Sequence, residues 1–268
     1  MSKRKTLKEL TLLDRFLFAE VMEDPENLAI LLEIILGKEI VLKYLPQTEK
    51  ERRNSPIYRF VKLDVWAKDE QDVIYDTEVQ TSNTKNLPKR SRYYQGMIDS
   101  KLLEPGTIDF NMLNDLFIII IAPFDIFGEG KYCYTFQMRC KEIPQLYLND
   151  GVTRIFLNTH GTNDDEVSQD LIELLHLMEY TNDNKQIYAN TNLQAMKNRI
   201  IDIQNNAEVS VRYMQEWEER ILEQQKAVDK EYLLIIQRNL DSGKSIEEIA
   251  NFLGKEVQEI QTLITKLE

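Results

Sequence analysis

The sequence has few of the residues from which zinc sites, disulfide frameworks and nucleophilic active sites are built. It contains only two cysteines and two histidines. Cys133 and Cys140 lack Cys-x-x-Cys spacing, and His160 lies sixteen residues before His176. We therefore expect neither a zinc site nor catalysis by a serine–histidine or cysteine–histidine pair.

Long apolar runs and low-complexity tracts are also missing. Stretches such as FIIIIAPF at 117–124 are far shorter than the roughly 18 apolar residues that a membrane helix needs. The basic start, MSKRKTLKEL, is not followed by the apolar region and cleavage site of a signal peptide. With nine glycines and seven prolines in 268 residues, the composition is that of a globular protein, and we expect it to be cytoplasmic.

An excess of positive charge, the usual mark of a nucleic-acid-binding protein, is absent from the chain as a whole. The formal net charge is −12. The first half is nearly neutral, however, because residues 1–141 carry 21 basic and 22 acidic side chains, whereas residues 142–268 carry 12 and 23. The segment KNLPKRSR at 85–92 contains four basic residues and no acid, so a local basic patch is compatible with the total.

Hydrophobic periodicity predicts a mixed succession of helices and strands up to about residue 180. Residues 7–36 have helical spacing interrupted near Asp24-Pro25, which predicts two helices. Residues 58–68 alternate as a strand, and the polar connection DEQD leads into a second strand, VIYDTEVQ at 73–80, so the two form a hairpin. Further elements are expected in this order: a helix at 90–102, strands at 116–124, 132–138 and 153–159, and a helix at 168–180.

The run LFIIIIAPF at 116–124 is typical of a strand covered on both faces and should lie centrally in the sheet. From about residue 190 the sequence becomes long, polar and helical. Near its end, Gly254 is expected to form a turn between two short helices. That arrangement resembles a helix-turn-helix, but packing of a helical hairpin on its own domain or on a partner explains it at least as well, because the second helix has little basic charge.

The hairpin places acidic residues together. If it is symmetric about residue 71, Asp64 faces Glu78, and like charges in directly opposed positions are destabilising unless something compensates. A divalent cation would compensate, and Gln80, on the same face, could orient a water or a phosphate oxygen. The alternative is a hairpin whose acids face water. Trp66 interrupts this face, Tyr75 lies nearby and a basic segment follows, which favours a site.

Four segments together resemble the PD-(D/E)XK nuclease family transposases, also described as recombination-promoting nucleases. They are LLDRFLFAEVMEDPENLAILLEIILGKEI, FVKLDVWAKDEQDVIYDTEVQ, LPKRSRYYQGMIDSKLLEPG and LFIIIIAPFDIFGEGKYCYTFQM, and the resemblance covers roughly residues 10–180. It implies an α/β fold with a restriction-endonuclease-like mixed central sheet flanked by helices. We expect this domain at residues 1–185, a long helical region at 186–228, and a small, helix-turn-helix-like element at 229–268.

The resemblance also implies roles for individual residues. Asp64, Glu78 and Gln80 would be catalytic, and Mg²⁺, or Mn²⁺ in its place, would be held by Asp64, Glu78 and the backbone carbonyl of Val79. An acid on the first helix would complete the site, with Asp14 matching best and Glu20 and Glu23 competing. Substrate would be bound by Lys62, Arg90 and Tyr94.

The function so implied is a Mg²⁺-dependent DNA endonuclease, associated with transposition, recombination or defence against mobile elements. Gln80 stands where the wider superfamily commonly has lysine; glutamine can hydrogen-bond a water but carries no charge, so activity could be weak or could depend on a second metal or on Lys62. One alternative is a non-catalytic DNA-binding or regulatory protein on a nuclease scaffold. Another is an interaction module that forms a homodimer through its C-terminal helices.

Overall fold

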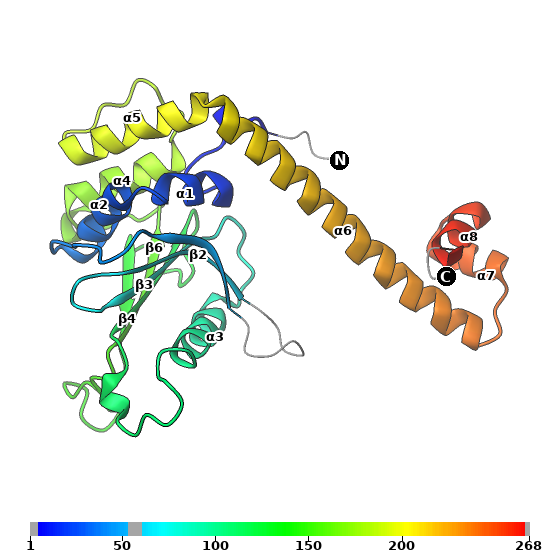
Figure 1. Cartoon of the computed structure of the whole chain (residues 1–268), viewed down its shortest axis with the longest axis horizontal. Coiled ribbons are helices and arrows are strands. Elements are labelled where there is room, and N and C mark those ends of the chain that lie inside the picture. Colours follow the sequence, from blue (N-terminus) through cyan, green and yellow to red (C-terminus); the bar gives the residue numbers. More distant parts are fainter. Residues whose placement is uncertain (1–4, 53–60, 266–268) are drawn as a thin grey trace. The chain divides into compact units, whose positions relative to one another are not determined.

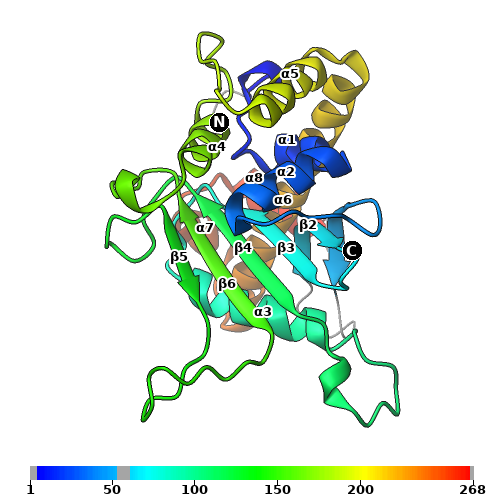
Figure 2. The same ribbon diagram turned by 90° about the vertical axis from the view of Figure 1, so that its left-hand side faces the viewer.

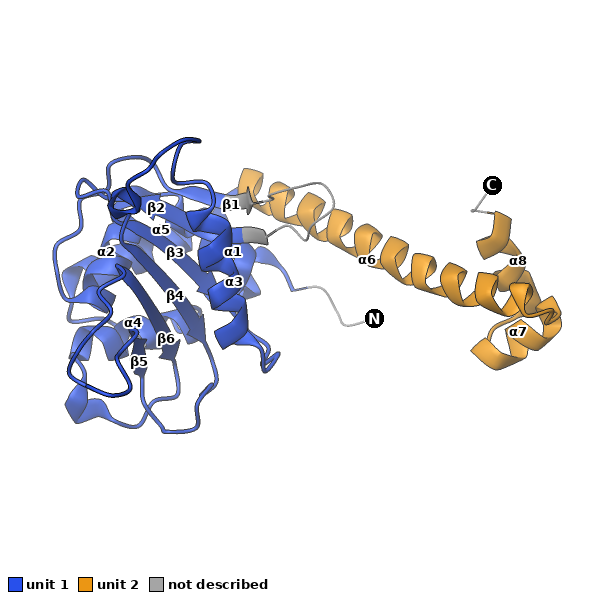
Figure 3. Cartoon of the chain, turned by 90° about the horizontal axis from the view of Figure 1, so that it is seen from below, with its two compact units in different colours: residues 1–206 blue, residues 207–268 orange. Residues whose placement is uncertain are grey.

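The computed structural model describes residues 5–52 and 61–265. It divides into two compact units, Met1–Asn206 and Ala207–Glu268, which are coloured separately in Figure 3. The first unit holds the sheet and its flanking helices, and the second is helical. The functional boundaries expected at residues 185 and 228 remain predictions.

The first unit is built on a six-stranded mixed sheet with strand order β1-β2-β3-β4-β6-β5. The strands β3, β4 and β6 are parallel, whereas β1–β2, β2–β3 and β5–β6 pair antiparallel. The strand bounds are β1 Gln47–Arg52, β2 Val61–Lys68, β3 Ile74–Val79, β4 Leu116–Ala122, β5 Cys133–Phe136 and β6 Val152–Asn158. The predicted fold class, a mixed sheet flanked by helices, is confirmed; the edge strand β1 was not predicted.

Helices cover both faces of this sheet (Figures 1 and 2). One face carries α3 (Leu87–Asp99), and the other carries α1 (Arg15–Met22), α2 (Pro25–Leu36), α4 (Gln169–Glu179) and α5 (Thr191–Asn205). Short 3₁₀ turns lie at Leu7–Glu9, Phe110–Met112 and Asp164–Glu166. The strand β4 lies in the middle of the sheet, as its continuous apolar sequence predicts. Six of its seven residues are buried, because helices cover both faces of the sheet.

The break between α1 and α2 has the local chemistry that the sequence predicted. The Asp24 side chain caps α2 by accepting a hydrogen bond from the Glu26 N–H at 2.9 Å, and Pro25 occupies the first helical turn, where its missing N–H costs nothing. Gly37 ends α2 at φ +66°, the left-handed conformation that glycine adopts without a steric penalty.

The β2–β3 hairpin has the predicted register. Val65 pairs with Thr77 and Trp66 with Asp76, so one further step along the strands brings Asp64 opposite Glu78. The turn at the other end is closed by Asp69, whose carboxylate accepts hydrogen bonds from the Gln71 and Val73 N–H groups and from the Tyr75 hydroxyl at 2.7–3.0 Å. The hydrogen bonds to this buried carboxylate therefore all come from residues of the turn and the start of β3.

The second unit consists of α6 (Ala207–Asp241), α7 (Ile246–Leu253) and α8 (Val257–Thr265). The C-terminal part of α6 packs with α7 and α8 around a small core that includes Ile236, Ile249 and Ile260. Gly254, at φ +61°, forms the predicted turn. Within residues 5–52 and 61–265, no helix is long and apolar enough to cross a membrane.

Candidate active site

The two acids of the hairpin lie where β2 and β3 separate. The backbone pairing of the two strands ends at Val65 and Thr77. Beyond that pair, the Glu78 carboxylate accepts a hydrogen bond from the Asp64 N–H at 3.0 Å, and the Asp64 carboxylate accepts one from the Val79 N–H at 3.2 Å. Each acid thus replaces a ladder hydrogen bond of the opposite strand, which fixes both carboxylates in the gap.

Both acids are buried. Asp64 is 2% exposed and Glu78 is 1% exposed, so the alternative of a hairpin whose acids face water is wrong. Burial and the neighbouring Asp64 carboxylate raise the pKa of Glu78 to about 8, although Arg90 and the Asp64 N–H oppose the shift. A pair of buried carboxylates with one pKa raised needs positive charge to be fully ionised at neutral pH.

The first such charge comes from Arg15, which sequence reasoning missed. Its Nε lies 2.6 Å from Oδ1 of Asp64, and its side chain is 37% exposed. Arg15 is the first residue of α1, so this helix places a cation beside the Asp64 carboxylate. The family pattern points to the neighbouring Asp14, and no periodicity in the sequence distinguishes Arg15 from an ordinary surface arginine.

The second charge comes from Arg90 on α3, which joins three of the predicted residues. It donates from Nη2 to Oε2 of Glu78 at 2.9 Å, from Nη1 to Oε1 of Gln80 at 2.7 Å, and from Nε to the Tyr94 hydroxyl at 2.7 Å. Its guanidinium also lies 5.1 Å from the centre of the Tyr94 ring. Burial and the Glu78 charge raise the pKa of Tyr94, so its hydroxyl stays protonated.

Gln80 is held at both ends of its amide. Its carbonyl oxygen accepts from Arg90, and its Nε2 donates to the Ser82 carbonyl at 2.7 Å. One N–H and one lone pair of the amide remain for a water or a phosphate oxygen. In this geometry, the Gln80 side chain holds the Arg90 guanidinium in place through the hydrogen bond to its carbonyl oxygen.

Other predicted residues are not joined to this cluster by these contacts. The Asp14 carboxylate accepts from the Thr11 N–H at 2.8 Å and lies 3.7 Å from Lys5 Nζ, so it serves the turn before α1. Glu20 lies on α1 and is half-buried. Lys62 belongs to β2, but its side chain is outside the described residues.

A family model for the PD-(D/E)XK nuclease family transposases matches residues 14–236. The match includes both strands of the hairpin, α3 and the buried charges described above. The chain belongs to this family. Comparisons with curated proteins and with solved structures gave no match. Membership in the PD-(D/E)XK family indicates a nuclease connected with transposition, and nucleases of this superfamily typically use divalent metals.

The two buried carboxylates, Asp64 and Glu78, suit a hard cation. Asp64 and Glu78 supply oxygen ligands, and Mg²⁺ is usually held by one or two carboxylates and substrate phosphates while it retains several waters. In the part of the chain that the structure describes, no three His, Cys, Asp or Glu side chains gather closely enough to hold a metal ion. The donor set therefore fits a two-carboxylate site in which water and substrate complete the coordination.

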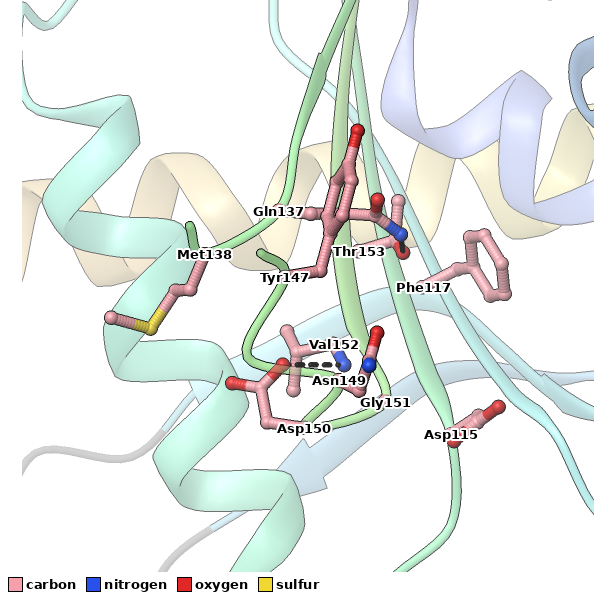
Figure 4. A pocket seen from close by; sticks show the side chains of 10 residues that line it. All are labelled: Asp115, Phe117, Gln137, Met138, Tyr147, Asn149, Asp150, Gly151, Val152 and Thr153. Carbon is pink, nitrogen blue, oxygen red and sulfur yellow. Dashed lines mark hydrogen bonds between the residues drawn. The ribbon is translucent and has the colours of Figure 1, made fainter. Parts of the chain in front are cut away.

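A separate cavity of about 300 Å³, whose lining residues Figure 4 shows, lies at the opposite end of the sheet from Asp64 and Glu78. It is lined by residues at the starts of β4 and β6, among them Asp115, Phe117 and Thr153, whereas Glu78 lies near the end of β3. The Asp150 carboxylate in its wall accepts from the Val152 N–H at 3.2 Å. This cavity has no part in the carboxylate cluster.

Proposed function

We propose that this protein is a Mg²⁺-dependent DNA endonuclease that hydrolyses phosphodiester bonds, acting in transposition, recombination or defence against mobile elements. The observation that carries the proposal is the pair of buried carboxylates, Asp64 and Glu78, each neutralised by an arginine from a different helix. A hairpin without function has no need to bury two acids at a point where its own strands part, because buried charges cost free energy even when they are paired.

The residues of the chain divide the work. Asp64 and Glu78, with the Val79 carbonyl, would hold the cation, which supplies Lewis acidity and charge neutralisation at the phosphodiester. Arg90 orients Glu78 through the hydrogen bond at 2.9 Å, and Gln80 and Tyr94 fix Arg90 in turn. This arrangement holds the acids before substrate arrives, which is the preorganisation that electrostatic catalysis requires.

The test is nicking of supercoiled plasmid DNA by the full chain with Mg²⁺, with Mn²⁺ and with EDTA. Wild type is compared with Asp64→Asn and Glu78→Gln, and with Asp72→Asn as a matched control. Asp72 is an exposed acid at the other end of the same hairpin, paired with Lys43. We expect metal-dependent nicking by wild type and by Asp72→Asn only. Equal activity of Asp64→Asn and wild type would refute the proposal.

One observation favours a second candidate, a DNA-binding or regulatory protein without catalysis. Three carboxylate oxygens of Asp64 and Glu78 accept a hydrogen bond from an N–H group, and the fourth, Oδ1 of Asp64, forms an ion pair with Arg15. If these contacts persist with metal present, the acids serve the fold alone. Folded wild-type protein that binds DNA but does not nick it with either metal would select this candidate.

We also propose a homodimer through the C-terminal helices. On α6, Met214, Ile221 and Val228 follow one another at seven-residue intervals, and each is 38–45% exposed. A seven-residue apolar repeat is the pattern with which two helices pack as a coiled coil. Sedimentation should therefore give a dimer for wild type and a monomer for Ile221→Glu, while a monomeric wild type would exclude the dimer.

A further inference from the structure

The outward face of α3 is built differently from the face that meets the active site. Arg90 and Tyr94 turn toward Glu78, whereas Lys89, Arg92 and Gly96 lie on the exposed side of the helix at spacings of three and four residues. We propose that this outward face is a docking surface for the sugar-phosphate backbone of duplex DNA, with Gly96 as the point of closest approach. The inference rests on the proposed function and specifies how its substrate is held.

Gly96 is not explained by the fold. It lies in the middle of α3, where glycine is less favourable than alanine because it loses more backbone freedom on folding. Its backbone does not have a positive φ, and a Cβ atom added there would have nothing within 4 Å. Neither turn geometry nor internal packing therefore requires glycine. A flat place on an exposed helix does suit a partner whose backbone comes close to the helix.

The charge around Gly96 identifies the kind of partner. Among the side chains that the structure describes, Lys89 and Arg92 pair with no carboxylate, although the whole chain has a net charge of −12. Asp99 is the single acid in the α3 sequence, and it lies half-buried in the last turn. Two unpaired cations on an otherwise acidic protein complement a polyanion, and phosphate contacts of this kind position DNA without reading its sequence.

The outward face lies on the same helix as a residue of the active site. Arg90 marks the point where α3 reaches Glu78, and Gly96 is six residues further along the helix. At 1.5 Å per residue this is an offset of about 9 Å along the helix axis, and six residues also turn Gly96 about 120° around the helix from Arg90. A duplex with one phosphodiester at the carboxylates would therefore have to pass around α3 to bring its backbone to the outer face.

The experiment measures binding of a fluorescent 20-base-pair duplex by anisotropy at several salt concentrations in EDTA, together with thermal melting of each variant. Gly96→Ala should raise the melting temperature by about 2–4 °C, because alanine favours the helix, and yet weaken DNA binding by about 5-fold. The Lys89→Gln/Arg92→Gln double variant should lower the slope of log K against log salt by about 2. Lys185→Gln, an exposed control between α4 and α5, should leave the affinity for DNA and the slope against salt unchanged.

The outcomes separate the two proposals. If wild type binds and Gly96→Ala and the double variant bind equally well, the docking surface is wrong and the nuclease proposal stands. If Gly96→Ala melts at a lower temperature than wild type, the site is not open within the chain and the argument from Gly96 fails. If wild type binds no DNA at any salt concentration, both proposals fail.

Discussion

The two ends of the β2–β3 hairpin each bury an aspartate, and they do so in different ways. Asp69 is 0% exposed, and the groups that bond to it come from within six residues of it along the chain. Asp64 is 2% exposed, and its partners are the Val79 N–H on the next strand and Arg15 on α1, 49 residues away. Burial alone therefore does not distinguish a candidate catalytic acid from an acid that serves a turn.

The difference lies in what supplies the compensation. At Asp69, two backbone N–H groups and a tyrosine hydroxyl bind the carboxylate, as a turn of the chain requires for its own closure. At Asp64 and Glu78, cations from α1 and α3, distant in the sequence, contact two adjacent carboxyl groups. The first arrangement closes a turn locally, and the second links two strands and two helices through a buried cluster of charged groups.

The largest expected effect separates activity from stability at the two ends. Asp64→Asn should lower the nicking rate on the order of 1,000-fold, since several kcal/mol of metal-assisted stabilisation are lost, while most of the stability remains. Asp69→Ala should lower the free energy of unfolding by about 3 kcal/mol, because buried donors lose their acceptor, while the rate per folded molecule is unchanged. Urea unfolding and plasmid nicking on the same preparations measure both. A loss of activity in folded Asp69→Ala would remove the distinction.

A second prediction concerns the cations at the two ends. Arg15→Gln should destabilise the protein by about 3 kcal/mol in EDTA, because Asp64 is left with an uncompensated buried charge. Adding Mg²⁺ should restore part of the loss. Lys43→Gln, which removes a partner of the exposed Asp72, should cost less than about 1 kcal/mol and respond no differently to Mg²⁺ from wild type. Equal urea midpoints of the two variants would contradict this contrast.

A third prediction concerns pH. The folded pKa of Glu78, at about 8, lies above its ordinary value of 4.5, so the folded state binds a proton that the unfolded state has released. In EDTA this contribution to stability is complete below pH 4.5 and is lost as pH rises through 8. Stability should fall by up to about 5 kcal/mol over that range, since each pKa unit corresponds to about 1.4 kcal/mol, and Glu78→Gln should flatten the curve. An unchanged slope in this variant would show that another group titrates.

The smallest expected effect is that of removing the Gln80 side chain, which holds Arg90 in place. Gln80→Ala removes one acceptor of Arg90 but leaves Glu78 and Tyr94 in contact with it. Loss of a group that orients a ligand typically costs 10- to 100-fold, so we expect a fall in nicking rate of about 10-fold. Gln80→Lys should not restore the nicking rate, because the lysine ammonium group would face the positively charged Arg90 guanidinium. Higher activity of Gln80→Lys than of wild type would mean that Gln80 acts on substrate directly.

The sequence was sufficient for the hairpin and for several of the side chains that the structure brings together at its open end. A symmetric polar turn determines which residues face each other, so Asp64 could be placed opposite Glu78 from local pattern alone. Arg90 and Tyr94 could be named because a helix follows β3 after a short connection and the family has a basic-aromatic helix there. Arg15 could not, since its contact with Asp64 depends on how α1 packs on the sheet, and nothing local records that. The edge strand β1 could not be predicted either, because its sequence, QTEKER, is polar throughout and lacks the alternation of apolar and polar residues that indicates a strand.

The reciprocal hydrogen bonds of Asp64 and Glu78 have a consequence for how such a chain can vary. Each carboxylate occupies the place of a backbone partner on the other strand, so the pair exists in one strand register only. One residue added between Lys68 and Ile74 would shift β3 against β2 and turn one acid to the opposite face of the sheet. Loops usually tolerate changes of length, but this turn cannot change its length unless the acid pair at the far end of the hairpin is lost.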